Sequence, residues 1–93
     1  MPGLKRKVVK KPGEELVKIF YQESGGRIHD IVIAGDFFIH PMEAMEKIEG
    51  GLFNCPIETH AMSRKLEEII KLHRITLRGI SVDTIVQTIL EAE

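Results

Sequence analysis

The sequence predicts an α+β fold, in which an antiparallel meander of about three strands is followed by about three helices packed on one face of the sheet. The first third of the chain is rich in β-branched and aromatic residues and contains two adjacent glycines at a turn. The remaining two thirds show apolar residues at spacings of three and four, the period of an amphipathic helix. Because 93 residues are too few for two separate cores, we expect one domain over residues 1–93.

The chain opens with a basic segment, residues 1–12, which contains Val8 and Val9 and ends at the turn signal Pro12-Gly13. This segment holds five basic residues and no acidic residue, although the whole chain carries a net charge of only −1. One interpretation is a surface for nucleic acid phosphate or for an acidic protein. The other is a solvated edge strand whose lysines discourage aggregation. No aromatic residue is interleaved with these charges, which argues against nucleic-acid binding.

Two strands joined by a tight hairpin are expected after the basic segment. Residues 16–22 (LVKIFYQ) and residues 27–34 (RIHDIVIA) have the composition of strands. Between them, Ser24-Gly25-Gly26 supplies the positive-φ freedom that a tight hairpin needs. In the second strand the last two isoleucines share one face, whereas Ile28 falls on the opposite parity. This change predicts a β-bulge or a partly buried second face.

The first helix is expected to begin at Pro41, because proline suits the first helical position. Its inward positions, each three residues apart, are Met42, Met45 and Ile48. The glycine pair at residues 50–51 is expected to end it.

Two further helices are expected in the last third of the chain. Thr59 or Ser63 is a candidate cap for the first of them, and Gly79 interrupts the pattern after it. Its apolar positions are Met62, Leu66, Ile69 and Ile70. In the last helix Ser81 is the expected N-cap, and Asp83 favours the positive N-terminal end. An amphipathic stripe is formed there by Val82, Ile85, Val86, Ile89 and Leu90.

The most unusual stretch, residues 35–41 (GDFFIHP), lies where the last strand gives way to the first helix. Gly35 permits a close backbone approach, and Asp36 is able to accept backbone N–H bonds or to face a ligand. Phe37 and Phe38 cannot both point into one core from a regular strand, because neighbouring side chains diverge. One ring is therefore expected to face outward, toward a partner or an apolar ligand. The alternative is an Asp-stabilised turn with both rings partly buried.

Taken with its flanks, this stretch resembles the C-terminal domain of lipoate-protein ligases. The resemblance runs from Gly26 to Phe38 (GRIHDIVIAGDFF) and continues through Pro41 and the acidic helix to Glu49. It is especially close to the archaeal form, in which that domain is a free-standing small subunit. Three features carry it: the glycine hairpin, the Gly-Asp-Phe-Phe corner, and a late Gly-Ile-Ser at residues 79–81. It covers nearly the whole chain after Pro12.

The resemblance implies an accessory subunit that has no activity of its own. In that family a larger catalytic subunit binds ATP, magnesium and lipoate, makes lipoyl-adenylate, and passes the lipoyl group to a lysine of an acceptor domain. The small domain is needed mainly for the activation step. Its fold, shared with iron–sulfur scaffold and sulfur-acceptor proteins, is an antiparallel sheet covered by helices. No catalytic residue carries over to this chain. The residues expected to face the partner or its ligand are Gly35, Asp36, Phe37, Phe38 and His40.

Two other functions stay open on the residues alone. A sulfur acceptor needs a single thiol, and Cys55 lies on an expected loop, although no adjacent cation obviously lowers its pKa. The competing interpretation of Cys55 is a small apolar filler beside Phe53 and Pro56. A plain interaction module would instead bind a partner through the exposed edge of the meander or through the Phe37-Phe38 corner.

Catalytic and metal-binding motifs do not stand out in the sequence. The four histidines show no metal-ligand spacing, and there is no glycine-rich phosphate loop or nucleophile elbow. No stretch approaches the roughly 18 apolar residues that span a membrane. Since a lone cysteine excludes an intramolecular disulfide, we expect a reducing compartment, the cytoplasm.

Overall fold

The computed structural model describes residues 3–93, so the first two residues of the basic segment lie outside it. The elements follow one another along the chain in the order β1 (Gly3–Val9), β2 (Val17–Ser24), β3 (Arg27–Gly35), β4 (Phe38–His40), α1 (Ala44–Gly51), α2 (Thr59–Leu72), β5 (Thr76–Arg78) and α3 (Val82–Glu91). The strands β1, β2 and β3 form an antiparallel sheet in that order, and β4 pairs with β5 in a separate two-stranded sheet.

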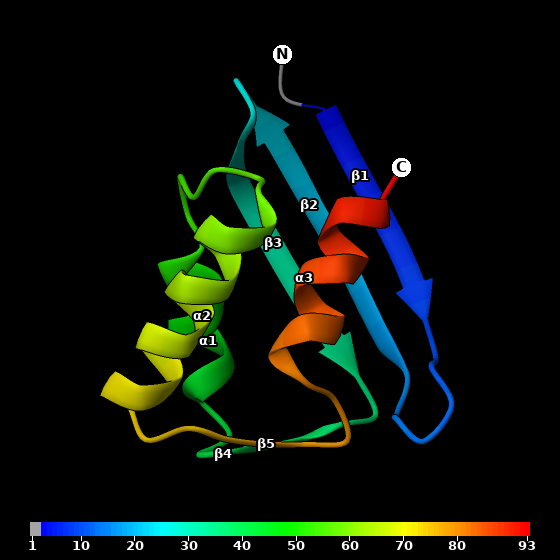
Figure 1. Ribbon diagram of the computed structural model, residues 1–93, viewed down its shortest axis with the longest axis vertical. Helices are drawn as coiled ribbons and strands as arrows, with labels where there is room; N and C mark the ends of the chain where they lie inside the picture. Colours follow the sequence, from blue (N-terminus) through cyan, green and yellow to red (C-terminus); the bar gives the residue numbers. More distant parts are fainter. Residues whose placement is uncertain (1–2) are drawn as a thin grey trace.

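All three helices lie on one side of the three-stranded sheet, and the small β4–β5 sheet lies at one end of the molecule (Figure 1). The predicted α+β architecture is therefore confirmed, with the meander first and the helices on one face. The sequence did not predict the β4–β5 sheet. Each of its strands has only three residues, too few to show an alternating pattern in the sequence.

The hairpin between β2 and β3 turns at Gly25 and Gly26, with φ values of 60° and 76°. Past this turn, Glu23 pairs with Ile28 while Gln22 pairs with Asp30, which leaves His29 as an extra residue in β3. The bulge at His29 returns Ile28 to the buried face, where it is fully enclosed. The predicted β-bulge is confirmed.

The core lies between the sheet and the helices. From the sheet it receives the inward side chains Val17, Ile19, Tyr21, Ile28, Ile31 and Ile33. The helices contribute Ala44, Ile48, Met62, Leu66, Ile69, Ile85, Val86 and Ile89. Each large aliphatic side chain buried in this way stabilises the fold by about 1.5–3 kcal/mol relative to leaving it in water. This burial holds α1, α2 and α3 against the sheet.

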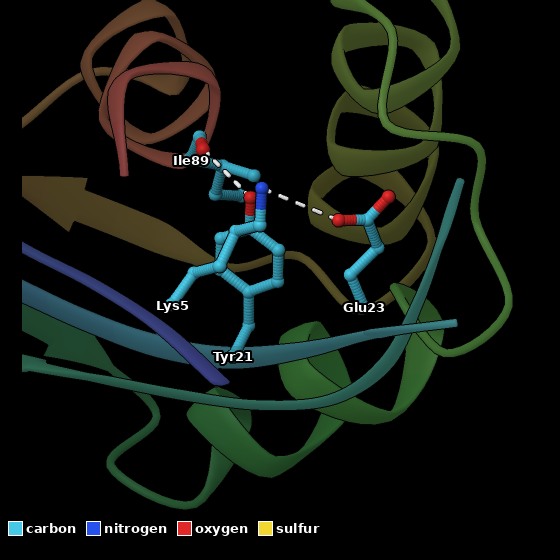
Figure 2. A network of polar contacts seen from close by, with 4 residues as sticks. All are labelled: Lys5, Tyr21, Glu23 and Ile89. Atoms are coloured by element: carbon cyan, nitrogen blue, oxygen red, sulfur yellow. Dashed lines mark hydrogen bonds and ion pairs between the residues drawn. The ribbon is translucent and has the colours of Figure 1, made fainter. Parts of the chain in front are cut away.

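A polar contact crosses this core between β2 and α3. The hydroxyl of Tyr21 donates a hydrogen bond to the carbonyl oxygen of Ile89 at 3.0 Å (Figure 2). Nearby, the ammonium of Lys5 on β1 lies 3.3 Å from the carboxylate of Glu23 on β2. The bond satisfies the one polar atom of the buried Tyr21 side chain.

The edge at β1 is partly covered by the end of the chain. The backbone N–H of Arg6 donates to the carbonyl oxygen of Glu93 at 3.1 Å, and the N–H of Glu93 donates back to Arg6 at 3.2 Å. The strand β1, which carries most of the basic segment, is thus an edge strand of the sheet. This matches the edge-strand interpretation of that segment.

The edge at β3 is covered by a loop and by two carboxylates. Ile28 exchanges backbone hydrogen bonds with Asn54 and Cys55 of the loop after α1. Farther along β3, the N–H of Ile31 donates to the side chain of its neighbour Asp30. The N–H of Ile33 donates to Glu49 of α1 at 2.8 Å. A partner strand would have to displace these acceptors to pair with β3.

Several helix boundaries differ from the sequence prediction. The helix α1 begins at Ala44, so Pro41 lies in a bend before it, and Met42 is 84% exposed instead of buried. The prediction of a side-chain cap at Thr59 or Ser63 was wrong, because Glu58 is the N-cap of α2 and makes no cap hydrogen bond. At α3 the prediction is confirmed, since the Ser81 hydroxyl accepts the N–H of Thr84.

Among residues 3–93, no helix has the length and apolar character that crossing a membrane requires.

Candidate functional site

The corner between β3 and β4, residues 35–40, is fixed by a close approach of two backbones. Gly35 has a φ of 153°, and a Cβ at this position would lie only 2.1 Å from the carbonyl oxygen of Leu16. The next residue, Asp36, donates its N–H to that same oxygen at 3.0 Å. Only glycine fits here, so the corner is anchored to the start of β2.

The two phenylalanines of the corner separate as the sequence predicts. Phe37 is partly buried and packs against the core, whereas Phe38 is 53% exposed. Ile39 then turns inward again, and His40 turns outward. This alternation confirms that one of the two rings is presented to solvent.

The exposed rings of the corner lie next to each other. Phe38 and His40 have ring centroids 6.5 Å apart and an interplanar angle of 3°. Across the small sheet, Phe38 is paired with Arg78 and His40 with Thr76, and all four residues are exposed. An aromatic ring, an imidazole and a guanidinium thus share the outer face of the β4–β5 sheet. We call these four residues the corner face.

From the sequence, Arg78 is one of four late basic residues (Arg64, Lys65, Arg74 and Arg78) that are either surface charge, the default interpretation, or contacts for a phosphate at the partner's site; the sequence does not place it beside Phe38. It lies 40 positions after Phe38, and the strand that carries it is too short to recognise from composition. Within residues 3–93, the ion pairs are Lys5 with Glu23 and Lys65 with Glu68, so no carboxylate neutralises Arg78. Its guanidinium is therefore available to an anionic group.

Backbone and side-chain bonds hold β5 and the start of α3 in place. The N–H of Glu15 donates to the carbonyl oxygen of Gly79 at 2.7 Å. The hydroxyl of Thr84 donates to the Glu14 carboxylate at 2.5 Å, and Thr84 is only 2% exposed. These bonds tie the β1–β2 loop to the segment that presents Arg78, which makes the corner face a fixed platform.

The predicted site residues lie outside the three grooves described here. Gly35, Asp36, Phe37, Phe38 and His40 are absent from the linings of the three grooves found among the described residues. The Asp36 carboxylate makes no hydrogen bond or ion pair within residues 3–93, so the sequence-based option of an Asp-stabilised turn is not seen. The corner presents a surface, and its side chains suit binding.

A groove of about 560 Å³ lies at the opposite end of β3 from the corner. It is bounded by the loop around Phe53 and by the first turns of α2, and Cys55 contributes to its floor. Cys55 is 7% exposed, and burial raises the pKa of its thiol, which the charges of Lys65 and Arg27 offset only in part. A thiol kept protonated in this way favours the packing interpretation over sulfur transfer.

A second groove, of about 470 Å³, runs between β3 and α1 and is acidic, with Asp30, Glu46 and Glu49 in its lining. Its carboxylates are not arranged as a metal site. In the described part of the chain, no group of three His, Cys, Asp or Glu side chains is placed to hold a metal ion.

Most of the chain matches the sequence pattern of one protein family. Residues 16–89 match the family described as the bacterial lipoate protein ligase C-terminus. The matched span includes β2, β3, the whole corner, β5 and most of α3. A comparison with curated proteins gives no match.

The fold is also found in a solved structure. A chain of an archaeal lipoylation system, described as a bipartite lipoate protein ligase and its E2 lipoyl domain from Thermoplasma acidophilum, superposes with a TM-score of 0.81. The two chains are 22% identical, and the match covers 96% of this chain and 97% of the other. At that identity the likeness establishes the fold, while the family match covers well over half of the sequence. The chain belongs to the family of lipoate protein ligase C-terminal domains.

Proposed function

We propose that this chain is the accessory subunit of a two-part lipoate-protein ligase. It would act with a separate catalytic subunit in the ATP-dependent activation of lipoate to lipoyl-adenylate. The observation that carries this proposal is the family match over residues 16–89, together with a superposition that spans 97% of a chain from a bipartite ligase. A partner that binds ATP, magnesium and lipoate, and that then modifies a lipoyl-acceptor domain, completes the proposed system.

The chemistry of activation gives such a subunit a role without a catalytic residue of its own. A carboxylate oxygen of lipoate forms a bond to the α-phosphorus of ATP while the bond to pyrophosphate breaks. This step requires the two groups to be held in line and water to be excluded, because water would hydrolyse the mixed anhydride. A second domain that closes over the pocket meets both needs.

The corner face is the surface that we assign to this contact. Its exposed Phe38 ring offers an apolar cover, and Arg78 offers an unneutralised guanidinium beside it. The anchored backbone at Gly35 presents both in a fixed geometry, so little ordering is needed on closure. Asp36 and His40 complete the surface proposed to face the partner, and Phe37, also predicted to face it, packs behind this surface against the core.

The test measures lipoyl-adenylate formation by the purified catalytic subunit, with and without this chain. We expect formation to depend on the chain, and transfer from chemically prepared lipoyl-adenylate to the acceptor domain to proceed without it. Equal rates of adenylate formation in both reactions would overturn the proposal.

A pair of matched variants tests the assignment of the corner face. Phe38→Ala removes a ring that is 53% exposed at the corner, and Phe53→Ala removes one that is 60% exposed at the far end of β3. We expect adenylate formation to fall with Phe38→Ala and to stay near the wild-type rate with Phe53→Ala. A larger fall in adenylate formation with Phe53→Ala than with Phe38→Ala would show that the contact does not lie at the corner.

A further inference from the structure

The side of the three-stranded sheet that faces away from the helices carries an apolar surface. Its outward residues, in three rows across β1, β2 and β3, are Leu4, Gln22 and Asp30; Arg6, Phe20 and Val32; and Val8, Lys18 and Ala34. We call these nine residues the sheet face. No element described between Gly3 and Glu93 packs on it, since the helices lie on the other side (Figure 1).

The apolar side chains of the sheet face are exposed to an extent unusual for their types. Leu4 is 72% exposed, Val8 52%, Val32 51% and the central Phe20 36%. Phe20 lies directly across from Arg6 on one strand and from Val32 on the other. Exposed apolar side chains gathered on one face of a sheet mark a surface that another molecule covers.

A small hollow lies in this surface. It measures about 100 Å³ and is lined by Leu4, Phe20, Gln22, Asp30 and Val32, among others. An apolar cavity of about 150 Å³ holds a benzene ring, so this hollow has room for one inserted aliphatic side chain. A few side chains that fill pockets carry most of the binding free energy at protein interfaces.

The charges on the sheet face decide which partner it fits. Arg6 and Lys18 are exposed, and neither takes part in an ion pair within residues 3–93. The one acidic residue on the face, Asp30, directs a carboxylate oxygen to the backbone N–H of Ile31 at 3.0 Å. The face is therefore apolar and net positive, and it complements an apolar surface that is bordered by carboxylates.

A second copy of this chain is a poor fit for the same reason. Two sheet faces stacked on each other would bring two net-positive surfaces together and remove Arg6 and Lys18 from water without sufficient counter-charge. Strand addition is also disfavoured at β3, where Asp30 and Glu49 already accept the N–H groups of Ile31 and Ile33. The occupant is therefore a different protein that contacts the face.

We infer that the sheet face is the docking surface for the ligase catalytic subunit, which inserts an apolar side chain between Leu4, Phe20 and Val32 and surrounds it with carboxylates. This inference rests on the proposed function. Nine residues are fewer than the 20–30 per partner found in a stable interface of roughly 800 Å². Ala34 of the sheet face is followed along the chain by the exposed Gly35 and Asp36, which lead to the corner, so the inferred contact extends from the sheet face toward the corner face.

The experiment is a binding titration of the separately purified catalytic subunit with full-length variants of this chain. Val32→Thr and Leu4→Thr reduce the apolar surface and keep or add a β-branched residue in a strand. The matched control is Leu72→Thr, because Leu72 is 71% exposed at the end of α2 and Leu4 is 72% exposed. We expect each sheet-face variant to weaken binding by about tenfold, and the control by less than about twofold.

A charge variant supports the titration without touching the apolar side chains. Arg6→Glu combined with Lys18→Glu reverses two exposed charges, so we expect slower association and a weaker dependence of its rate on salt. Circular dichroism confirms in each case that the variant is folded.

Three outcomes would overturn the inference. If the wild-type chain binds but the sheet-face variants bind equally well, the docking surface is elsewhere and the proposed function stands. If the wild-type chain does not bind the catalytic subunit, the proposed function fails and this inference with it. If the isolated chain forms a dimer that Val32→Thr dissociates in sedimentation equilibrium, the face is occupied by a second copy.

Discussion

The hydroxyl of Tyr21 on β2 bonds to the carbonyl oxygen of Ile89 on α3, and so joins residues 68 positions apart in the sequence. Tyr21 is 3% exposed and Ile89 is fully buried, so this hydrogen bond lies in the core. It joins α3 to the sheet (Figure 2). The last residue of the chain, Glu93, also pairs with Arg6 on β1. The position of α3 therefore depends on polar contacts, including the bond from Tyr21 to Ile89 and the bond from Thr84 to Glu14, as well as on apolar packing.

Removing the hydrogen bond from Tyr21 to Ile89 is expected to lower the stability of the protein and to leave its fold unchanged. Tyr21→Phe keeps the ring and deletes the hydroxyl, so we expect a loss of about 0.5–1.5 kcal/mol in the free energy of unfolding. Urea denaturation followed by circular dichroism measures the loss. A variant as stable as the wild type would show that the bond to Ile89 contributes nothing net.

The same hydroxyl predicts how stability depends on alkaline pH. Burial raises the pKa of Tyr21 above its usual value, Lys5 opposes this shift, and Glu23 adds to it. The unfolded chain therefore loses its phenol proton at lower pH than the folded chain. The contribution of the Tyr21 phenol to the free energy of unfolding is constant below the ordinary tyrosine pKa. It declines as the pH rises through the raised folded-state pKa.

This titration can be followed directly, because the chain has one tyrosine and no tryptophan. The absorbance of tyrosinate near 295 nm should show a higher midpoint in the folded protein than in the protein unfolded in urea. Tyr21→Phe separates the tyrosine from other groups that titrate at high pH, since its stability should decline less over the same range. Equal midpoints in the two states would contradict the prediction.

A pair of alanine variants tests the close approach at the corner. At Gly35, alanine would have a positive φ and a Cβ 2.1 Å from a backbone oxygen. We therefore expect Gly35→Ala to lower the free energy of unfolding by more than about 1–3 kcal/mol. At Gly50, in α1, a Cβ meets nothing within 4 Å, and alanine should stabilise by about 0.5–1 kcal/mol. Thermal unfolding of both variants measures the two effects, and a Gly35→Ala variant of wild-type stability would disprove the close approach.

The thiol of Cys55 is expected to act as a packing group. Because burial raises its pKa, alkylation by iodoacetamide at neutral pH should be slower in the folded protein than in the urea-unfolded protein. Cys55→Ala should leave adenylate formation by the complex unchanged. Cys55→Ser should be the less stable variant of the two by about 1–3 kcal/mol, since it buries a hydroxyl. A persulfide on Cys55 after incubation with a cysteine desulfurase would instead support the sulfur-transfer alternative.

Some properties of this protein follow from local sequence. The glycines at 25 and 26 place the hairpin, the broken parity at Ile28 announces the bulge, and Ser81 begins α3. The divergence of Phe37 and Phe38 was also predictable, because it depends only on the alternation of side chains along an extended strand. Each of these features is decided by residues within a few positions of one another.

Other properties were decided by contacts between distant segments. Arg78 reaches Phe38 only because β4 and β5 pair across the two helices between them, and strands of three residues leave no periodic signal. Met42 fits the apolar spacing of a helix, yet α1 begins after it, at Ala44.

The sequence by itself therefore determined the order of the main elements, the hairpin, the bulge and the outward ring of the corner, because turn chemistry and side-chain periodicity act over a few residues. The tertiary structure alone decided which charges join Phe38 at the corner and which carboxylate covers the edge of β3 at Ile33. It also decided that Leu4, Phe20 and Val32 share one open face. These juxtapositions depend on strand register and on the burial of a common core, which no local pattern encodes.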